Sequence, residues 1–219
     1  ERANVGVQQC TYEVVDEFPH DPDAFTQGLV YEDGRLFEGT GLYGESTLRE
    51  VDLETGDVLR SQALSPELFG EGITLHDGRI FQITWQSQTA IVYDAETFEE
   101  IERFSYTTEG WGITDDGERL YMSDGTNTIS IREPDTFSEI DRIEVSEDGE
   151  PVDNLNELEW IDGQIYANVW QTDEIVRIDP ATGNVTARID LSGLLTPEDQ
   201  AGLEVDVLNG IAWDEEGQR

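Results

Sequence analysis

A short sequence phrase recurs five times along the chain and constrains its fold more than any other feature. Each copy opens with a polar or aromatic residue, usually continues with Gly and an aliphatic residue, and ends at an Asp-Gly or similar turn. The five copies open at Gln27, Glu71, Trp111, Asn156 and Asn209. A repeat of about 40 residues built from short strands and tight turns is typical of a β-propeller. The repeat therefore predicts an all-β, five-bladed β-propeller with equivalent residues around one central channel.

Each repeat carries the pattern of four antiparallel strands. In the first repeat we predict strands at Gly28–Tyr31, Arg35–Gly41, Thr47–Asp52 and Val58–Ala63. The first two strands are joined by Asp33-Gly34, which is a strong hairpin signal because both residue types tolerate a positive φ. The later strands alternate apolar and polar residues, as expected of strands with one buried face.

The two ends of the sequence are expected to close the ring. Thr11–Phe18 has no inner strands before it, and we predict that it forms the outer strand of the last blade, which begins at Asn209. We treat 1–219 as a single propeller domain whose last blade is incomplete, and we expect further chain after Arg219 because an open blade would leave strand edges unpaired. The insertion Ser192–Val207 is predicted to start a short helix at Thr196–Asp199 and to form a flap over one end of the channel.

The charge of the chain is strongly negative. It carries 50 acidic and 12 basic residues, for a formal charge of −38, and every basic residue is Arg. An excess of acid without Lys suits a halophilic protein that works in molar salt, where short Debye lengths screen self-repulsion. Such a surface repels nucleic acid and anionic lipid, and no apolar run is long enough to span a membrane. We therefore expect an exported or extracytoplasmic protein of a high-salt organism, without nucleic-acid partners.

Several common reaction centres are absent from the sequence. Cys10 is the only cysteine, which excludes an intrachain disulfide and a cysteine-based metal cluster. His20 and His76 share neither a repeat position nor a metal-ligand spacing, so a histidine-based zinc site is not predicted. The sequence also lacks a Gly-rich phosphate loop and a nucleophile elbow.

The residues that open the five inner strands are expected to converge at one mouth of the channel. They are four polar residues and one Trp, whereas a purely structural position would carry interchangeable small or apolar residues. Phe25 and Phe69 lie two residues upstream of the first two, and Trp85 and Trp170 share a position on the second strand. Aromatic walls around a few polar groups are typical of a small-molecule pocket. Burial there would raise the pKa of Glu71, which suits proton transfer.

At these positions the sequence resembles the plant and bacterial type of glutaminyl cyclotransferase, a family of five-bladed propellers. The resemblance covers positions 25 to 212. It rests on eight stretches in order: Phe25-Thr26-Gln27-Gly28-Leu29, Gly41-Leu42-Tyr43-Gly44 with Leu48-Arg49, Phe69-Gly70-Glu71-Gly72, Thr84-Trp85, Gly110-Trp111-Gly112 with Ser123-Asp124-Gly125, Leu155-Asn156-Glu157-Leu158-Glu159, Ala167-Asn168-Val169-Trp170-Gln171-Thr172 and Val207-Leu208-Asn209-Gly210-Ile211-Ala212.

The resemblance implies an acyltransferase that converts N-terminal glutamine to pyroglutamate and releases ammonia. It implies that the partner is a peptide or protein with N-terminal glutamine and that Glu71 is the proton-transfer carboxylate. The family also carries a Gly-Lys element on the second strand of the last blade, beyond the end of this sequence, and its Lys belongs to the active site. The implied substrate pocket consists of Phe25, Gln27, Phe69, Trp85, Trp111, Asn156 and Trp170, with Asn209 as a further candidate.

The reaction implied by the resemblance requires no cofactor, and a structural cation such as calcium in the central channel is compatible with the family. Two other functions stay open on the residues alone. A non-catalytic propeller would bind a small ligand or peptide at the same mouth. A glycosidase would need two opposed carboxylates, for which Glu71 would have to act with Glu157 or Asp124.

The acidic composition predicts that folding depends on salt. Fifty acidic residues against twelve arginines repel one another at low ionic strength, and nothing in the composition neutralises them. We expect the melting temperature to rise strongly between roughly 0.1 M salt, where the Debye length is about 10 Å, and molar salt. Thermal melts across that range test this expectation. A constant melting temperature would show that the acidity is tolerated without being an adaptation to salt.

Overall fold

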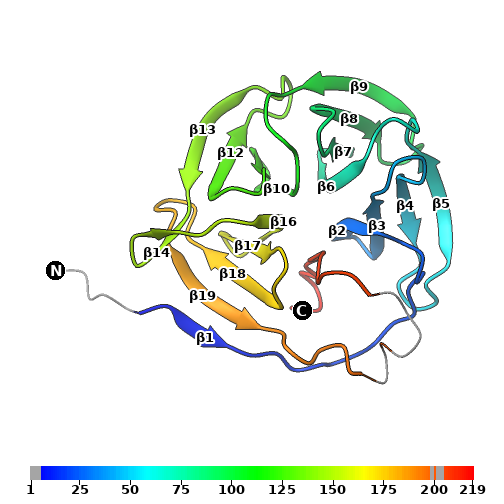
Figure 1. Ribbon diagram of the computed structural model, residues 1–219. Helices are drawn as coiled ribbons and strands as arrows, with labels where there is room; N and C mark the ends of the chain where they lie inside the picture. Colours follow the sequence, from blue (N-terminus) through cyan, green and yellow to red (C-terminus); the bar gives the residue numbers. More distant parts are fainter. Residues whose placement is uncertain (1–5, 198–199, 201–204) are drawn as a thin grey trace.

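The computed structural model describes residues 6–197, 200 and 205–219, and these form antiparallel blades arranged around a central axis (Figure 1). The first blade is the sheet β2-β3-β4-β5 and the second blade is the sheet β6-β7-β8-β9. Their strands are β2 (Thr26–Glu32), β3 (Arg35–Thr40), β4 (Thr47–Val51), β5 (Val58–Ala63), β6 (Gly70–His76), β7 (Arg79–Thr84), β8 (Thr89–Asp94) and β9 (Glu100–Ser105).

The third blade is the sheet β10-β11-β12-β13 and the fourth blade contains β16-β17-β18-β19, so the fold is an all-β propeller. The described residues include no helix of the length and apolar character that a membrane span requires. The remaining strands are β10 (Ile113–Asp115), β11 (Leu120–Ser123), β12 (Thr128–Arg132), β13 (Glu139–Glu144), the small hairpin β14 (Ser146–Glu147) and β15 (Glu150–Pro151), β16 (Leu155–Ile161), β17 (Gln164–Val169), β18 (Glu174–Ile178) and β19 (Val185–Asp190).

The Asp-Gly signals form tight hairpin turns as the sequence predicts. Asp33 and Gly34 have φ values of 52° and 78°, and Asp162 and Gly163 have values of 49° and 78°. Two consecutive residues with positive φ define the type I′ turn, whose twist matches that of the flanking strands. The four strands predicted for the first repeat are confirmed, with ends that differ by one or two residues.

The repeated glycines lie where the inner strands of neighbouring blades approach each other most closely. A Cβ atom on Gly28 would lie 2.5 Å from the backbone of the second blade, and one on Gly112 would lie 2.1 Å from the carbonyl oxygen of Asn156. The backbone of Gly72 donates a 2.9 Å hydrogen bond across the blade boundary to Trp111. Only a residue without Cβ allows this approach, so the glycines of the repeat determine how tightly the inner strands surround the axis.

The hydrophobic core lies between adjacent blades. Phe37 of the first blade packs with Ile73 of the second, and Phe81 of the second blade stacks on Phe137 of the third with ring centroids 6.2 Å apart. Between the third and fourth blades the core includes Leu158 of β16. Each blade is therefore stabilised by burial against its neighbours, as in other repeat architectures.

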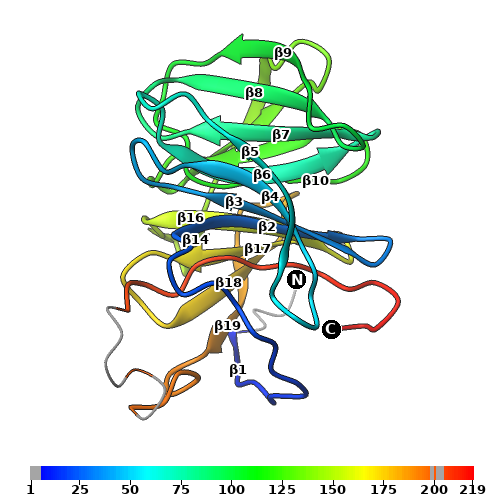
Figure 2. The ribbon, with the colours of Figure 1, turned by 90° about the vertical axis from the view of Figure 1, so that its right-hand side faces the viewer.

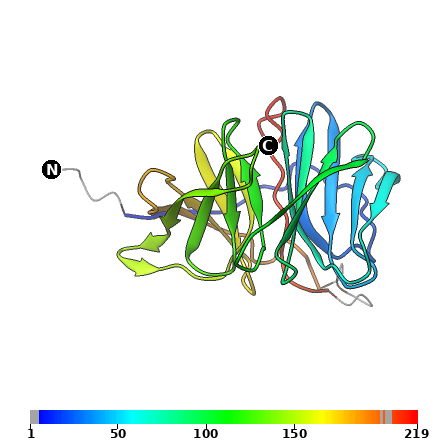
Figure 3. The same cartoon turned by 90° about the horizontal axis from the view of Figure 1, so that it is seen from above.

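The fifth blade is not confirmed, because residues 205–219, which carry the fifth copy of the repeat, form no strand. This segment lies between the fourth and first blades and is red in Figures 1 and 3. Glu157 accepts a 2.9 Å hydrogen bond from the backbone of Ile211, and Glu159 accepts one of 2.9 Å from Trp213. The carboxyl groups of Glu157 and Glu159 thus bind backbone N–H groups that a neighbouring strand would otherwise bind. Residues 205–219 can therefore occupy an inner position without joining a sheet.

The prediction that residues 11–18 form the outer strand of the last blade is wrong. The N-terminal strand is β1 (Gln8–Cys10), and it pairs in parallel with β19 as a fifth strand of the fourth blade. Residues 11–18 form no strand and run along the outside of the molecule toward the first blade (Figure 2). The physical reason is that β19 presents an unpaired edge, whereas residues 205–219 offer no sheet to which an outer strand could be added.

Replacing Gly112 by Ala is expected to lower the free energy of unfolding by about 1–3 kcal/mol, the usual cost of overpacking. The added methyl group would meet the backbone of the fourth blade at 2.1 Å. Gly6→Ala is the control, because a Cβ atom there meets nothing within 4 Å. Urea denaturation measures both variants. An unchanged midpoint for Gly112→Ala would show that the inner strands can separate without cost.

Glu159 is expected to make the protein less stable as the pH rises from about 4.5 toward 8. Desolvation raises the pKa of this carboxyl group from 4.5 to about 8. The folded state therefore holds a proton that the unfolded state has already released in this window, so rising pH favours unfolding. Glu159→Gln does not titrate and keeps an oxygen for the N–H of Trp213, so its melting temperature should fall less with pH.

The control for Glu159→Gln is the same change at Glu118, which is exposed in the turn after β10. Thermal melts at several pH values compare the parent and the two variants. Parallel pH profiles for the parent and Glu159→Gln would contradict the assignment.

Candidate active site

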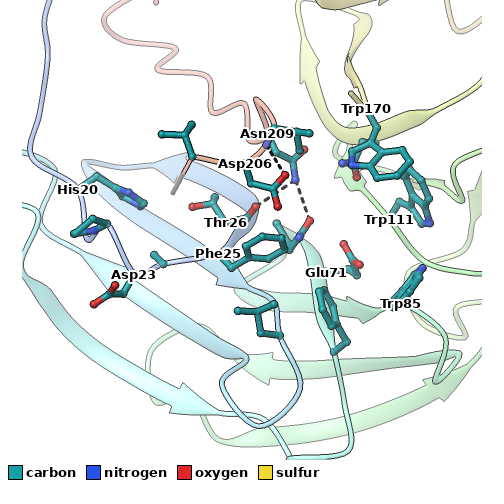
Figure 4. Close-up of a pocket in the computed structure, with 18 of the residues that line it drawn as sticks. His20, Asp23, Phe25, Thr26, Glu71, Trp85, Trp111, Trp170, Asp206 and Asn209 are labelled. Atoms are coloured by element: carbon teal, nitrogen blue, oxygen red, sulfur yellow. Dashed lines mark hydrogen bonds between the residues drawn. The ribbon is translucent and has the colours of Figure 1, made fainter. Parts of the chain in front are cut away.

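A pocket of about 850 Å³ lies where the inner strands begin, at one mouth of the channel. In an antiparallel blade the start of the inner strand and the end of the second strand meet at the same end, so residues distant in sequence converge there. Figure 4 shows side chains from several blades facing this pocket. It is lined by every residue that the sequence analysis placed in the site: Phe25, Gln27, Phe69, Glu71, Trp85, Trp111, Asn156, Trp170 and Asn209.

The inner strands are irregular at the site residues. The pairing of β2 with β3 shifts register between Thr26 and Gly28, and the pairing of β6 with β7 shifts between Gly70 and Ile73. The strand β16 shows the same kind of irregularity next to Asn156. Bulges are common near active sites because they redirect a side chain out of the regular alternation. Here they turn the residues that open the repeats toward the pocket.

Glu71 is the buried carboxylate of the pocket. Its side chain is 6% exposed, and desolvation raises its pKa well above the ordinary value of 4.5. The negative charge of Glu109 raises this pKa further. None of the hydrogen bonds within the described part of the chain involves the Glu71 carboxyl group. A carboxyl group in this state can exchange a proton with a bound ligand and is free to contact it.

Aromatic rings form the walls around Glu71. Phe25 and Phe69 pack edge to face with centroids 6.2 Å apart, and Phe69 and Trp85 lie 5.6 Å apart. On the other side Trp111 and Trp170 pack edge to face at 5.4 Å. The rings therefore form two packed clusters, one on each side of Glu71. Together they limit the water that can reach the carboxyl group.

Two glycines that follow the second strands β3 and β11 make room for these rings. A Cβ atom on Gly41 would lie 2.6 Å from the ring of Phe69, and one on Gly125 would lie 2.6 Å from the indole of Trp111. The position alternates along the sequence between these glycines and the pocket residues Trp85 and Trp170. Gly41 therefore leaves space for Phe69, and Gly125 leaves space for Trp111.

The polar groups of the pocket are arranged by hydrogen bonds from neighbouring strands. The Asn209 amide donates to the side-chain oxygen of Gln27 at 2.9 Å and to the carbonyl of Thr26 at 3.3 Å. The amide nitrogen of Gln27 is consequently left as a donor on the pocket side. Asn156 is 5% exposed and is held through its backbone carbonyl, which accepts a 2.6 Å hydrogen bond from Ser123.

Sequence reasoning missed Glu109, which supports the aromatic wall from outside. One oxygen of its carboxylate accepts hydrogen bonds from the indole nitrogens of Trp85 at 2.8 Å and Trp111 at 3.0 Å. The signal was present in the repeat, because Glu109 precedes Trp111 by two residues, as Phe25 and Phe69 precede the first two opening residues. Comparing this offset in all five repeats would have identified it.

Several described residues of the predicted flap, the insertion Ser192–Val207, line the pocket. The insertion contributes four residues to the lining: Leu195, Val205, Asp206 and Val207. The segment before β2 contributes His20 and Asp23. The helix expected at Thr196–Asp199 includes residues 198 and 199, which lie outside the described residues.

The second carboxylate that the glycosidase interpretation requires beside Glu71 is not in the pocket lining. Asp124 is absent from its lining, and Glu157 is fully buried in the channel, where it accepts backbone hydrogen bonds from Leu29 at 3.3 Å and Ile211 at 2.9 Å. Glu157 thus faces N–H donors on both sides, which is not an arrangement that binds a cation. Within the described ranges no group of three or more His, Cys, Asp and Glu side chains could hold a metal ion.

Comparisons with known proteins agree with this geometry. The sequence profile of the glutamine cyclotransferase family matches residues 1–219. The glutaminyl-peptide cyclotransferase of Arabidopsis thaliana is 46% identical over 210 residues, which cover 94% of this chain. The matched part spans 66% of the length of that relative.

Solved structures are similar to this chain at two levels, that of the family and that of the fold alone. The crystal structure of Myxococcus xanthus glutaminyl cyclase superposes with a TM-score of 0.90 and 34% identity, covering 97% of this chain and 91% of that chain. The WD40 repeats of RRP9 superpose with a TM-score of 0.52 at 9% identity, covering 72% of this chain and 48% of that chain, which reflects the propeller fold alone. From the match along its whole length, this chain belongs to the glutamine cyclotransferase family.

Proposed function

We propose that this protein is a glutaminyl-peptide cyclotransferase that converts N-terminal glutamine to pyroglutamate and releases ammonia. The observation that carries the proposal is the buried Glu71 carboxyl group, which has a raised pKa and stands without a hydrogen-bond partner among the described residues in an aromatic pocket. The family membership and the Arabidopsis relative support the same activity. The proposed substrate is a peptide or protein whose N-terminal glutamine fits a pocket of about 850 Å³.

The reaction joins two groups of the same residue. The α-amine nitrogen of the substrate bonds to its own γ-carboxamide carbon, and the bond from that carbon to the amide nitrogen breaks. Because the attack is intramolecular, the pocket needs to select the folded conformer and exclude water. Glu71 accepts the proton that the attacking amine loses and delivers a proton to the departing nitrogen, so the protons balance within one carboxyl group.

The polar side chains of the pocket orient the reacting carboxamide. The amide of Gln27 presents its nitrogen to the pocket because its oxygen is engaged by Asn209. Together with the amide of Asn156 it can donate to the oxygen on which negative charge develops during attack. The aromatic walls pack the apolar stem of the substrate glutamine. No step of this scheme requires a cofactor, and we place no calcium ion at Glu157 because its neighbours there are N–H donors.

We also propose that residues 205–219 occupy the inner position of a fifth blade. They carry the fifth copy of the repeat, and Asn209 lines the pocket in the same position as the residues that open the other repeats. The hydrogen bonds from Leu29 and Ile211 to Glu157 connect this segment to both neighbouring blades. A ring of five sectors would place the first and fourth blades as the immediate neighbours of the segment.

The charge of the chain supports the proposal that this protein works at high salt concentration. A formal charge of −38 without Lys fits a protein of a high-salt organism and disfavours nucleic-acid partners. We propose an extracytoplasmic location in such an organism.

Glu71→Gln should keep the size of the side chain but lose proton transfer. We expect kcat on a peptide with N-terminal glutamine to fall by at least about 100-fold, the lower end of the usual effect of general acid–base catalysis, with little change in KM. Ammonia release and the mass of the peptide measure turnover. Glu118→Gln, the same chemical change at an exposed turn, should retain parent turnover.

Two outcomes would count against the proposal. Near-parent turnover by Glu71→Gln would assign proton transfer to another group. A folded parent that binds the peptide but releases no ammonia would favour the non-catalytic binding protein.

A further inference from the structure

Glu109 lies outside the pocket lining but accepts hydrogen bonds from aromatic residues of two of its walls. It sits between β9 and β10, next to Trp111, and receives the indole N–H groups of Trp85 and Trp111 on a single oxygen. Its second oxygen accepts a 3.0 Å hydrogen bond from the amide of Gln86. Trp85 follows the second strand of the second blade, whereas Trp111 opens the third blade. One carboxylate therefore connects the two walls across a blade boundary.

The environment of Glu109 keeps it negatively charged. Burial opposes ionisation, but the hydrogen bonds from Trp111, Gln86 and Trp85 outweigh it and hold the pKa of Glu109 below its ordinary value. The pKa of Glu71, by contrast, is raised by burial and by the charge of Glu109. Two carboxyl groups whose environments move their pKa values apart are a common basis for division of roles in active sites.

We propose that Glu109 is a positioning residue that fixes Trp85 and Trp111 in two adjoining walls of the Glu71 pocket and acts on Glu71 through its charge. This inference rests on the proposed cyclotransferase function. Indole rings that are bound at their nitrogen atoms cannot rotate away from the substrate, so the space around Glu71 keeps its shape. Rigid walls matter because a misplacement of about 1 Å can cost about 100-fold in rate.

The charged and titratable groups near Glu71 come from few elements. Glu109 approaches from the segment before β10, and Tyr106 from the end of β9, where burial raises its pKa to about 12 and leaves it neutral. His20, Asp23 and Asp206 line the rim of the same pocket. Among these groups, Glu109 is the one whose charge raises the pKa of Glu71. Removing the charge of Glu109 should therefore change the dependence of kcat/KM on pH.

Glu109→Gln separates charge from position. Its amide oxygen can still accept the indole N–H groups, but the negative charge is gone. The pKa of Glu71 should fall, and the acidic limb of kcat/KM against pH should move to lower pH, while kcat/KM at the optimum changes less than in Glu109→Ala. Glu102→Gln, exposed on β9, is the matched control and should keep the parent profile.

Glu109→Ala removes both effects and should lower kcat/KM by about 10- to 100-fold, largely through KM. Trp85→Phe keeps an aromatic ring, although a smaller one, but loses the N–H donor, so adding Glu109→Ala to it should cost less than adding Glu109→Ala to the parent. If Glu109→Ala does not fold, the pH profile of Glu109→Gln and the kcat/KM of Trp85→Phe decide the question.

An active parent with a Glu109→Gln profile identical to that of Glu102→Gln would overturn the role of Glu109 alone. Additive effects of Trp85→Phe and Glu109→Ala would do the same. An inactive parent would reject the proposed function and this inference together.

Discussion

The close approach of the inner strands at glycine is the contact on which the rest of the structure depends. At Gly28, Gly72 and Gly112 a Cβ atom would lie under 3.0 Å from the neighbouring blade. Such a distance would force the strands apart, since packed interiors tolerate little added volume. The inner strands can therefore surround a narrow axis, and the residues that open them converge from different blades on one pocket.

The fourth repeat departs from this pattern and has Glu157 where the others have glycine. Its side chain extends into the channel and accepts backbone hydrogen bonds from Leu29 and Ile211. A buried carboxyl group is costly unless its oxygens are bound, and here the N–H groups of two neighbouring segments bind them. The substitution of Glu for Gly thus joins residues 205–219 to the first and fourth blades without a regular sheet.

The candidate site combines two carboxyl groups in contrasting environments. Glu71 is desolvated between aromatic rings, whereas Glu109 is stabilised as an anion by three hydrogen bonds. The indoles of Trp85 and Trp111 serve both groups, because their faces border the pocket and their nitrogen atoms bind Glu109. The same rings therefore shield one carboxyl group from water and stabilise the negative charge of the other by hydrogen bonds.

The sequence alone determined the repeat, the type I′ turns, the strands of the first blade and the residues of the pocket, because strand alternation, Asp-Gly turns and repeat register are local properties. Tertiary structure decided the rest. Strand β1 pairs with the edge of β19 and residues 205–219 form no strand, because both depend on which strand edges are left unpaired once the blades are packed. Glu109 likewise acquires its role only when two blades bring Trp85 and Trp111 to the same oxygen.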